Sequence, residues 1–275
     1  MARPFLKMNG LGNDFVVVDA RAAPFEPTLE EVRAIADRAS GVGCDQLISI
    51  EPRAGSDGFM RIWNADGGEV EACGNAARCV AWLLTEGQRY SKVVIDTKGG
   101  ELLAARLDPR TVRIDMGKPG LLWTQIPLAE DMDTRGIELQ VGPIDNPVLH
   151  TPGCVNMGNP WVVFFVPDAE AAPVAQVGSM IEHHYLFPQG VNVGFAQIKA
   201  PDRIRLRVWE RGVGITRACG TGACAAVVAA SRRSLSRRHA VVEMDGGELD
   251  IDWAQDDGRV YMTGPVELEY EGVLP

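Results

Sequence analysis

The feature that most constrains this chain is a short motif that occurs twice. Residues 72–79 read ACGNAARC and residues 218–224 read ACGTGAC, so Cys73 and Cys219 stand 146 residues apart (219 − 73 = 146). The three-residue match alone proves little, because small residues are common. A repeat that holds at one long spacing, however, indicates two copies of a structural unit.

The same spacing matches other positions without gaps. Farther along, the register slips by one residue, and GGEL at 99–102 meets GGEL at 246–249. The sequence therefore predicts a tandem duplication. The ungapped pairs are Gly12 with Gly158, Asn13 with Asn159, Gln46 with Asn192, Arg61 with Arg207, Trp63 with Trp209, and Asn64 with Glu210.

Length and charge limit the class of protein. A chain of 275 residues fits about two domains of roughly 150 residues each. Its formal net charge of -10 argues against a nucleic-acid partner. The N-terminus does not resemble a signal peptide, and no apolar stretch approaches the ~20 residues that span a bilayer. We therefore expect a cytoplasmic protein with no membrane partner and with reduced cysteines.

Short apolar runs rich in β-branched residues alternate with Gly, Pro and Asp clusters, which is typical of strands in a large sheet. The second half repeats the pattern of the first. The predicted strands lie at 15–20, 46–50, 59–63, 92–97, 101–107 and 112–116, and then at 161–166, 192–198, 204–209, 240–244, 248–253 and 260–263.

Each half also contains two predicted helices. The first, at 28–41, begins with Thr28 and Glu31 in capping-box spacing and has its counterpart at 174–184. The second follows each repeated cysteine, at 74–87 and 220–234. Both of these helices are apolar almost all round, which predicts that each is buried in a core.

These patterns predict an α+β fold of two pseudo-symmetric domains. Each domain is expected to be a mixed β-sheet or barrel wrapped around a central helix, with the active site in the cleft between the domains. Residues 1–118 would form the first half, with 265–275 pairing back onto it, and 119–264 the second.

A cysteine at the start of a buried helix has a chemical meaning. The first turn leaves backbone N–H groups unpaired, which favours a thiolate and offers a site for a carboxylate. Two such thiols could remove a proton from one face of a carbon and return one to the opposite face. The duplication would supply this pair as Cys73 and Cys219. The alternative is that a cysteine at a tight turn is only a small buried residue.

The other cysteines are predicted to be structural. Cys79 and Cys224 lie within the central helices, and Cys44 and Cys154 have no partner of the same type in the repeat. None of the cysteines or histidines shows the spacing of a zinc site, and the glycine-rich segments lack a nucleotide-binding pattern. We therefore expect no metal and no cofactor.

With these motifs the chain resembles the pyridoxal-independent diaminopimelate epimerases over nearly its whole length. In the first cysteine motif Gly68 stands where the family has Ser, a mild departure. The motifs that carry the resemblance are NGLGNDF at 9–15, GVGCDQ at 41–46, NADGGEVEACGNAAR at 64–78, GNP at 158–160, GVN at 190–192 and ERGVGITRACGTGAC at 210–224.

The resemblance implies conversion of LL- to meso-diaminopimelate in lysine and peptidoglycan precursor synthesis, by an isomerase that needs no cofactor. It implies that Cys73 and Cys219 are the catalytic thiols. Gly74, Asn75, Gly220 and Thr221 would hold the reacting carboxylate from the two helix starts. The rest of the substrate would be bound by Asn13, Gln46, Asn64, Asn159, Asn192, Glu210 and Arg211.

One departure from the family pattern concerns the tuning of a thiol. The family usually continues GNP with a His, whereas this chain has Trp161. The hypothesis is that, without this His, Glu210 and the helix start are sufficient to set the pKa of the thiol. The resemblance also implies a homodimer, with Tyr270 as the candidate interface residue.

Two alternatives remain open from the sequence. The chain could be a racemase or epimerase of another amino acid on the same fold, since two cysteines would serve it equally. It could also be an amino-acid-binding protein or a dithiol redox switch, although the lack of a C-x-x-C motif weakens the redox reading. Activity with and without reductant separates these classes.

Overall fold

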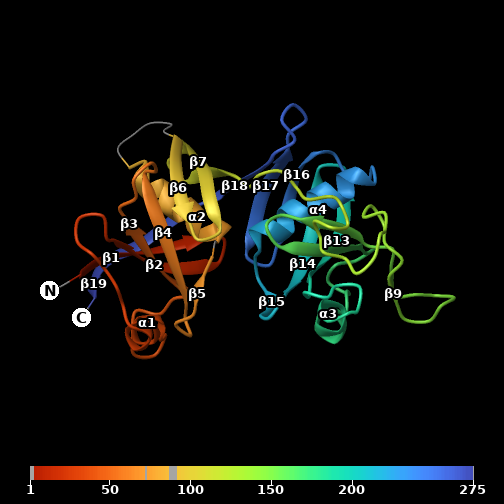
Figure 1. The fold of residues 1–275 in the computed structure, drawn as a ribbon, viewed down its shortest axis with the longest axis horizontal. Coiled ribbons are helices and arrows are strands. Elements are labelled where there is room, and N and C mark those ends of the chain that lie inside the picture. The colour runs from red at the N-terminus through yellow and green to blue at the C-terminus, as the bar shows by residue number, and fades with distance from the viewer. Residues whose placement is uncertain (1–2, 72, 87–91, 275) are drawn as a thin grey trace. The chain divides into compact units, whose positions relative to one another are not determined.

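The structure is a computed structural model that describes residues 3–71, 73–86 and 92–274. Its contacts divide the chain into two compact units (Figure 1). The first unit comprises Met1–Asp115 with Thr263–Pro275, and the second comprises Met116–Met262. No helix in the described part of the chain is long and apolar enough to cross a membrane.

The first unit contains two helices, α1 (Leu29–Ala36) and α2 (Gly74–Leu84). Its last strand, β19, pairs antiparallel with its first, β1. The strands are β1 (Arg3–Gly10), β2 (Asn13–Asp19), β3 (Gln46–Glu51), β4 (Gly58–Asn64), β5 (Glu69–Val70), β6 (Lys92–Thr97), β7 (Gly100–Asp108), β8 (Thr111–Asp115) and β19 (Glu267–Leu274).

The second unit contains α3 (Val174–Glu182) and α4 (Gly220–Arg232). The final residues of β18 run on into the first unit. The strands are β9 (Gln140–Val141), β10 (Leu149–His150), β11 (Gly153–Asn156), β12 (Pro160–Phe165), β13 (Asn192–Ala200), β14 (Arg203–Glu210), β15 (Gly214–Thr216), β16 (His239–Met244), β17 (Gly247–Trp253) and β18 (Val260–Pro265).

The two units share one strand topology. In the first, β2 and β3 are parallel, β3 and β4 antiparallel, β4 and β6 parallel, and β6 and β7 antiparallel. The same order recurs in β12, β13, β14, β16 and β17. Even the register repeats, because Phe15 lies opposite Gln46 and Trp161 opposite Asn192. The predicted sheet-dominated α+β fold is confirmed.

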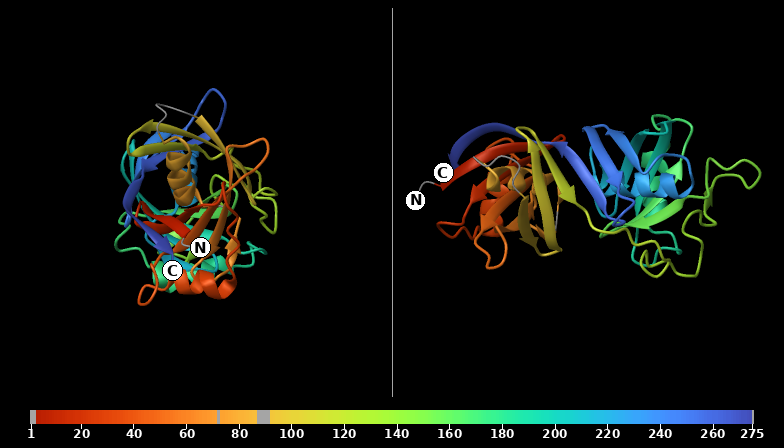
Figure 2. Two further views of the ribbon diagram at one scale, coloured as in Figure 1. Left: turned by 90° about the vertical axis from the view of Figure 1, so that its left-hand side faces the viewer. Right: turned by 90° about the horizontal axis from the view of Figure 1, so that it is seen from above.

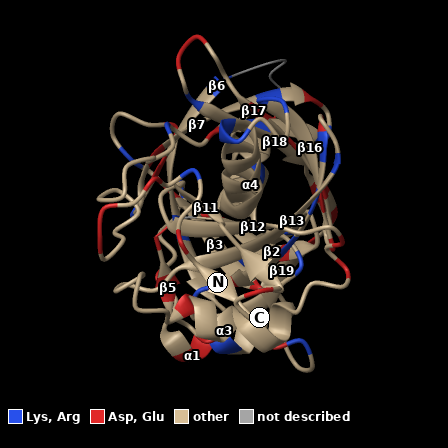
Figure 3. Cartoon of the chain, turned by 90° about the vertical axis from the view of Figure 1, so that its right-hand side faces the viewer, with Lys and Arg blue, Asp and Glu red and all other residues tan. Residues whose placement is uncertain are grey.

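Each unit is built around one buried helix. In the first, α2 contacts strands β1, β2, β4, β6, β7 and β8; in the second, α4 contacts β11–β14, β16 and β17. Figure 2 shows these helices with strands around them, and in Figure 3 the ribbon of α4 is mostly tan, the colour of uncharged residues. Residues 222–230 of α4 are all buried. A helix that is apolar on every side removes its nonpolar surface from water only when strands surround it in this way.

The shorter helices cover the outer faces of the sheets. Val32 and Ala36 of α1 pack with Val16, Val18 and Leu47 in one core cluster. Helix α3 contacts β13, β14 and β15 in the same manner. Strands covered on both faces read as continuous apolar runs rather than alternating ones, which explains the FVVV and WVVFF segments.

The first helix is shorter than predicted. It begins as expected, because the Thr28 side chain accepts from the Glu31 N–H and the Glu31 carboxylate accepts from the Thr28 N–H. It ends at Ala36, however, and not at Gly41. Asp37 ends it, because its carboxylate accepts from the Ala39 N–H and so stabilises a turn in place of another helical residue.

Candidate active site

Both repeated cysteines occupy the position that precedes a central helix. Cys73 (φ -146°, ψ 115°) precedes α2 and Cys219 (φ -140°, ψ 115°) precedes α4, so both are extended. Their carbonyls already accept helical hydrogen bonds, from the Ala77 N–H at 2.9 Å and the Ala223 N–H at 3.0 Å. Each thiol therefore lies beside the positive end of a buried helix, where an anion is stabilised.

In the second unit, Cys219 contacts a carboxylate. Its thiol donates to Glu210 Oε2 across 3.1 Å, while the Thr216 hydroxyl donates to Glu210 Oε1. The hairpin between β14 and β15 brings this about, because Glu210 ends β14 opposite Gly214. Cys219 is only 8% exposed, and its backbone N–H points to the Met244 sulfur at 3.4 Å. A buried thiol is thus held against a proton acceptor.

The environment of Cys219 outweighs the effect that the helix start alone would have on the acidity of the thiol. Burial first, and then the negative charge of Glu210, raise the pKa of the Cys219 thiol well above its usual value. The helix start acts in the expected direction, because a hydrogen bond from the Gly222 N–H lowers this pKa, but burial and Glu210 outweigh it. In the resting protein Cys219 is therefore a neutral thiol, able to donate a proton.

Trp161 occupies a fixed place beside this thiol. Its ring is fully buried, and its indole N–H points to Asn159 Oδ1 at 3.0 Å and to Thr221 Oγ1 at 3.2 Å. The Thr221 hydroxyl in turn lies 3.5 Å from Cys219 Sγ. Because an indole N–H can only donate, Thr221 accepts from Trp161 and keeps its own proton for the sulfur. Trp161 itself cannot exchange a proton.

Asn192 and Arg211 come together through the backbone. The Asn192 side chain donates to the Pro160 carbonyl at 2.8 Å and accepts from the Arg211 backbone N–H at 3.0 Å. The Arg211 side chain is exposed and donates to the Gln189 carbonyl at 2.7 Å. Asn192 thus fixes the chain directly after Glu210 and leaves the guanidinium at the surface.

The first unit brings its predicted residues together in two pairs. The Asn75 side chain, in the first turn of α2, donates to Asn13 Oδ1 at 3.3 Å. Gln46 donates to Asn64 Oδ1 at 2.9 Å across neighbouring strands. Gly74 opens α2 directly after Cys73, as Gly220 opens α4 after Cys219.

The two units differ in proton-transfer capacity. Asn64 stands at the position equivalent to Glu210, and an amide cannot take up a proton. The second unit therefore has the carboxylate of Glu210 where the first has the amide of Asn64, which is hydrogen-bonded to Gln46.

The other cysteines lie in the core, as predicted. Cys44, Cys79, Cys154 and Cys224 are each at most 2% exposed. Burial raises the pKa of Cys44 to about 11 and that of Cys79 to about 12, so both remain thiols at neutral pH. Among the described residues, no three side chains of His, Cys, Asp or Glu gather as a metal site requires.

Three residues near the site were missed from the sequence. Thr216 donates to Glu210, Met244 contacts Cys219, and the buried Glu182 accepts from the Gly212 N–H at 2.9 Å and from the Trp209 indole at 2.7 Å. Only Thr216 had a local signal, because it follows Glu210 by six residues across a glycine turn. The other two contacts come from distant segments.

The fold is shared with solved structures of other proteins, among them named epimerases and a named racemase. A hydroxyproline epimerase of Agrobacterium vitis, for example, superposes with a TM-score of 0.69 over 99% of this chain and 92% of that one, at 14% sequence identity. At that identity the likeness shows a shared two-domain fold. It does not show the substrate.

Sequence comparison is more specific. The family model described as diaminopimelate epimerase matches residues 5–122 and 153–269. A diaminopimelate epimerase of Phenylobacterium zucineum is 62% identical over all of this chain and 99% of its own length, and one of Caulobacter sp. strain K31 is 58% identical over 100% and 98%. The chain belongs to the diaminopimelate epimerase family, and it is an enzyme of the isomerase class.

Proposed function

We propose that this enzyme converts LL-2,6-diaminopimelate to the meso isomer without a cofactor, in lysine and peptidoglycan precursor synthesis. Sequence identity of 62% and 58% to two diaminopimelate epimerases, over the whole of this chain, supports the choice of substrate. The observation that carries the chemistry is the Cys219 thiol, which stands at a helix start and donates to Glu210 at 3.1 Å. Cys73 stands at the equivalent helix start of the first unit.

In the proposed reaction the two cysteines act from opposite faces of the α-carbon. In one direction the Cys73 thiolate removes the α-proton, and the neutral Cys219 thiol returns its own proton to the other face. This step leaves Cys73 as a thiol and Cys219 as a thiolate, which are the acid and the base that the reverse direction needs. For the resting pair to begin in the reverse direction, Glu210 accepts the Cys219 proton and the Cys73 thiolate takes a proton from solvent. Each thiol is thus acid one way and base the other, as a reversible reaction requires.

The helix starts would hold the reacting carboxylate. Backbone N–H groups at Gly74 and Asn75, and at Gly220 and Thr221, belong to first turns that have no intrahelical acceptor for them. They would stabilise the negative charge that develops when the α-proton leaves. This arrangement also gives Thr221 a second role, because its hydroxyl can donate to the Cys219 thiolate while Trp161 fixes its direction.

The remaining polar residues would bind the second amino-acid group of the substrate. Arg211 would pair with its carboxylate, and the amides of Asn13, Gln46, Asn64, Asn159 and Asn192 would supply donors and acceptors. We further propose that the enzyme acts in the cytoplasm as a homodimer. Tyr270 on β19, 47% exposed and edge-to-face with Phe5, is the proposed interface residue.

The substrate is tested by incubating the reduced protein with LL-diaminopimelate and separating the isomers by chromatography. The proposal predicts a mixture that approaches equilibrium between the LL and meso forms. Conversion of another amino acid, such as hydroxyproline, with none of diaminopimelate would contradict the substrate. Activity that requires oxidation would contradict the thiol mechanism.

A further inference from the structure

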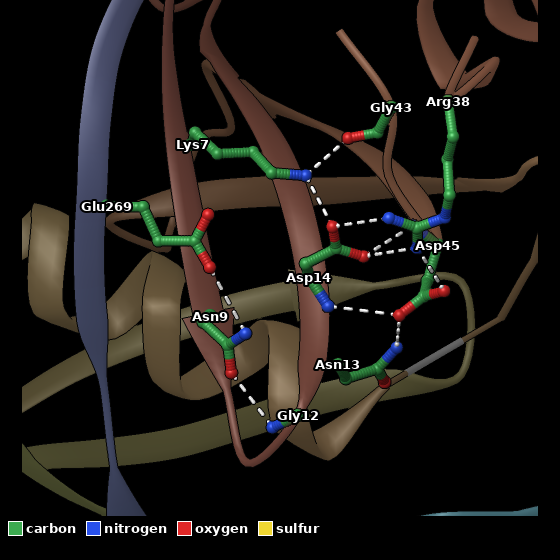
Figure 4. Close-up of polar contacts among 9 residues, drawn as sticks. All are labelled: Lys7, Asn9, Gly12, Asn13, Asp14, Arg38, Gly43, Asp45 and Glu269. Atoms are coloured by element: carbon green, nitrogen blue, oxygen red, sulfur yellow. Dashed lines mark hydrogen bonds and ion pairs between the residues drawn. The ribbon is translucent and has the colours of Figure 1, made fainter.

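A cluster of four charged side chains lies in the first unit, outside the residues so far assigned to the site (Figure 4). Lys7 comes from β1, Asp14 from β2, Arg38 from the segment after α1, and Asp45 directly precedes β3. Asp14 is the centre of the cluster. Its carboxylate accepts from Lys7 at 2.5 Å, from Arg38 at 2.7 and 2.9 Å, and from the Asp45 N–H at 3.0 Å.

The cluster is both ionised and partly buried. The side chains of Lys7 and Asp14 are 6% and 13% exposed. Burial works to raise the pKa of Asp14, but hydrogen bonds from Arg38 and Lys7 outweigh it and hold that pKa well below its usual range. Lys7 also donates to the Gly43 carbonyl. Because burying charges costs free energy, such a cluster calls for an explanation beyond stability.

Asp45 connects this cluster to the site. One oxygen of its carboxylate accepts from Arg38 at 2.8 Å, and the other accepts from the Asp14 N–H at 3.0 Å and from the Asn13 side chain at 2.8 Å. An ionised carboxylate can only accept hydrogen bonds. The NH₂ group of Asn13 must therefore face Asp45, and its oxygen must face the other way.

The fixed orientation of Asn13 reaches the central helix. Its oxygen accepts from the NH₂ group of Asn75, the second residue of α2 and two positions from Cys73. Asn75 is only 4% exposed. Its Oδ1 is buried and accepts no hydrogen bond from the part of the chain that the structure describes. A buried acceptor of this kind suits an N–H donor such as the ammonium group of an amino acid.

We propose that Asp45, held by Arg38 and Asp14, is a positioning residue of the site. Asp45 determines the orientation of the Asn13 side-chain amide, and Asn13 in turn determines the orientation of the Asn75 side-chain amide. Asn75 Oδ1 is then free to accept a hydrogen bond from an ammonium group of the substrate. This role rests on the proposed epimerase function. The juxtaposition that carries it is the continuous chain of hydrogen bonds from Arg38 through Asp45 and Asn13 to Asn75.

The duplication argues that the cluster is not needed by the fold. The second unit has the same strand topology, yet the charged residues have no charged counterparts there except a histidine. The cluster therefore adds something to the first unit that the scaffold does without. The equivalents of Lys7, Asp14, Arg38 and Asp45 are Gly153, Pro160, His184 and Val191.

A double-mutant cycle between Asn13 and Asp45 tests the proposal. Asp45→Asn leaves one acceptor oxygen where Arg38 on one side and Asn13 on the other each need one, so Asn13 is no longer held in a single direction. Asn13→Asp sets two carboxylates face to face, and each single variant should lower kcat/KM about tenfold or more. Combining the two reverses the hydrogen bond while still offering an acceptor to Asn75. The combined variant should therefore exceed either single variant in kcat/KM by about fivefold or more.

Side-chain amide NMR provides a readout that needs no substrate. In ¹⁵N-labelled protein, the Asn75 side-chain signal, assigned with an Asn75→Asp variant, should shift in Asp45→Asn and return in the combined variant. Asp96→Asn removes another ion pair of this unit, with Arg53 at 2.8 Å, and should move neither the signal nor kcat/KM. Should Asp45→Asn alone not fold, comparing Asn13→Asp with the combined variant still decides.

The outcomes separate this inference from the proposed function. An unshifted Asn75 signal in Asp45→Asn, or a combined variant no better than Asn13→Asp, would overturn the positioning role. A wild-type protein that does not epimerise diaminopimelate would overturn the proposed function. The NMR comparison would still test whether Asp45 and Asn13 orient the Asn75 side chain.

Discussion

At the scale of single residues, Glu210 distinguishes the two halves of the repeat. Its carboxylate raises the pKa of Cys219, second only to burial, and accepts a hydrogen bond from the thiol, which is the proposed path of the proton. These two effects act in opposite directions on the reaction. The negative charge disfavours the thiolate, whereas the capacity to take a proton allows the thiolate to form when it is needed.

Glu210→Gln should separate these effects. Without the negative charge, the pKa of Cys219 falls toward its usual value, so alkylation of Cys219 by iodoacetamide should set in at lower pH than in the wild type. Epimerase activity should nevertheless fall by about 10²–10⁴-fold, because an amide cannot take the proton. Glu170→Gln, an exposed carboxylate of the same unit, is the matched control. Activity that rises together with alkylation would refute the proton-acceptor role.

Trp161→His tests whether a titratable side chain is needed beside Cys219. Trp161 supplies only a donor, so Glu210 and the helix start are expected to suffice. The variant should keep a pH–rate profile of wild-type shape, with lower stability because a smaller ring leaves a void. Trp161→Phe controls for the loss of the indole N–H. A several-fold gain in rate for Trp161→His would contradict the account.

At the scale of elements, the central helices fit the strands beneath them through complementary sizes. Gly222 of α4 lies against Trp161, and a Cβ there would come within 2.8 Å of the indole. The equivalent positions of the first unit are Ala76 and Phe15, both fully buried. The larger ring is thus paired with the smaller helical residue.

Gly222→Ala should therefore destabilise the protein. Alanine is the better helix former by ~1 kcal/mol, but overpacking against an immobile ring costs about 1–3 kcal/mol, so the net change is unfavourable. The combination of Gly222→Ala with Trp161→Phe reproduces the pairing of the first unit and should recover most of the loss. Thermal unfolding measures both. A stabilised Gly222→Ala single variant would show that Trp161 has room to move.

Periodic apolar elements were predictable from the sequence, and the contacts between distant segments were not. The two buried helices and most strands followed from local patterns. Strand β1 was not predicted, because charged residues interrupt its apolar pattern. Residues 265–275 were expected to pair back onto the first half, but β1 as their partner could not be identified from local patterns. The raised pKa of Cys219 was missed for a similar reason, since it depends on burial and on Glu210 together.

At the scale of the whole molecule, the central question is whether the duplicated scaffold also associates with a second copy. Light scattering of the wild type should give twice the 29.8 kDa mass of the chain. Tyr270→Asp, which places a charge on β19, should shift the protein toward monomer. Tyr185→Asp controls for the loss of an exposed tyrosine, at 71% exposure. A monomeric wild type at assay concentration would remove the dimer from the account.

The most direct test of the two-thiol mechanism is proton NMR of LL-diaminopimelate in deuterated water with the reduced protein. The wild type should remove the α-proton signal as the meso isomer forms. Cys73→Ala and Cys219→Ala should each abolish conversion, because each removes the acid or base on one face. Conversion that continues in either variant would contradict the account.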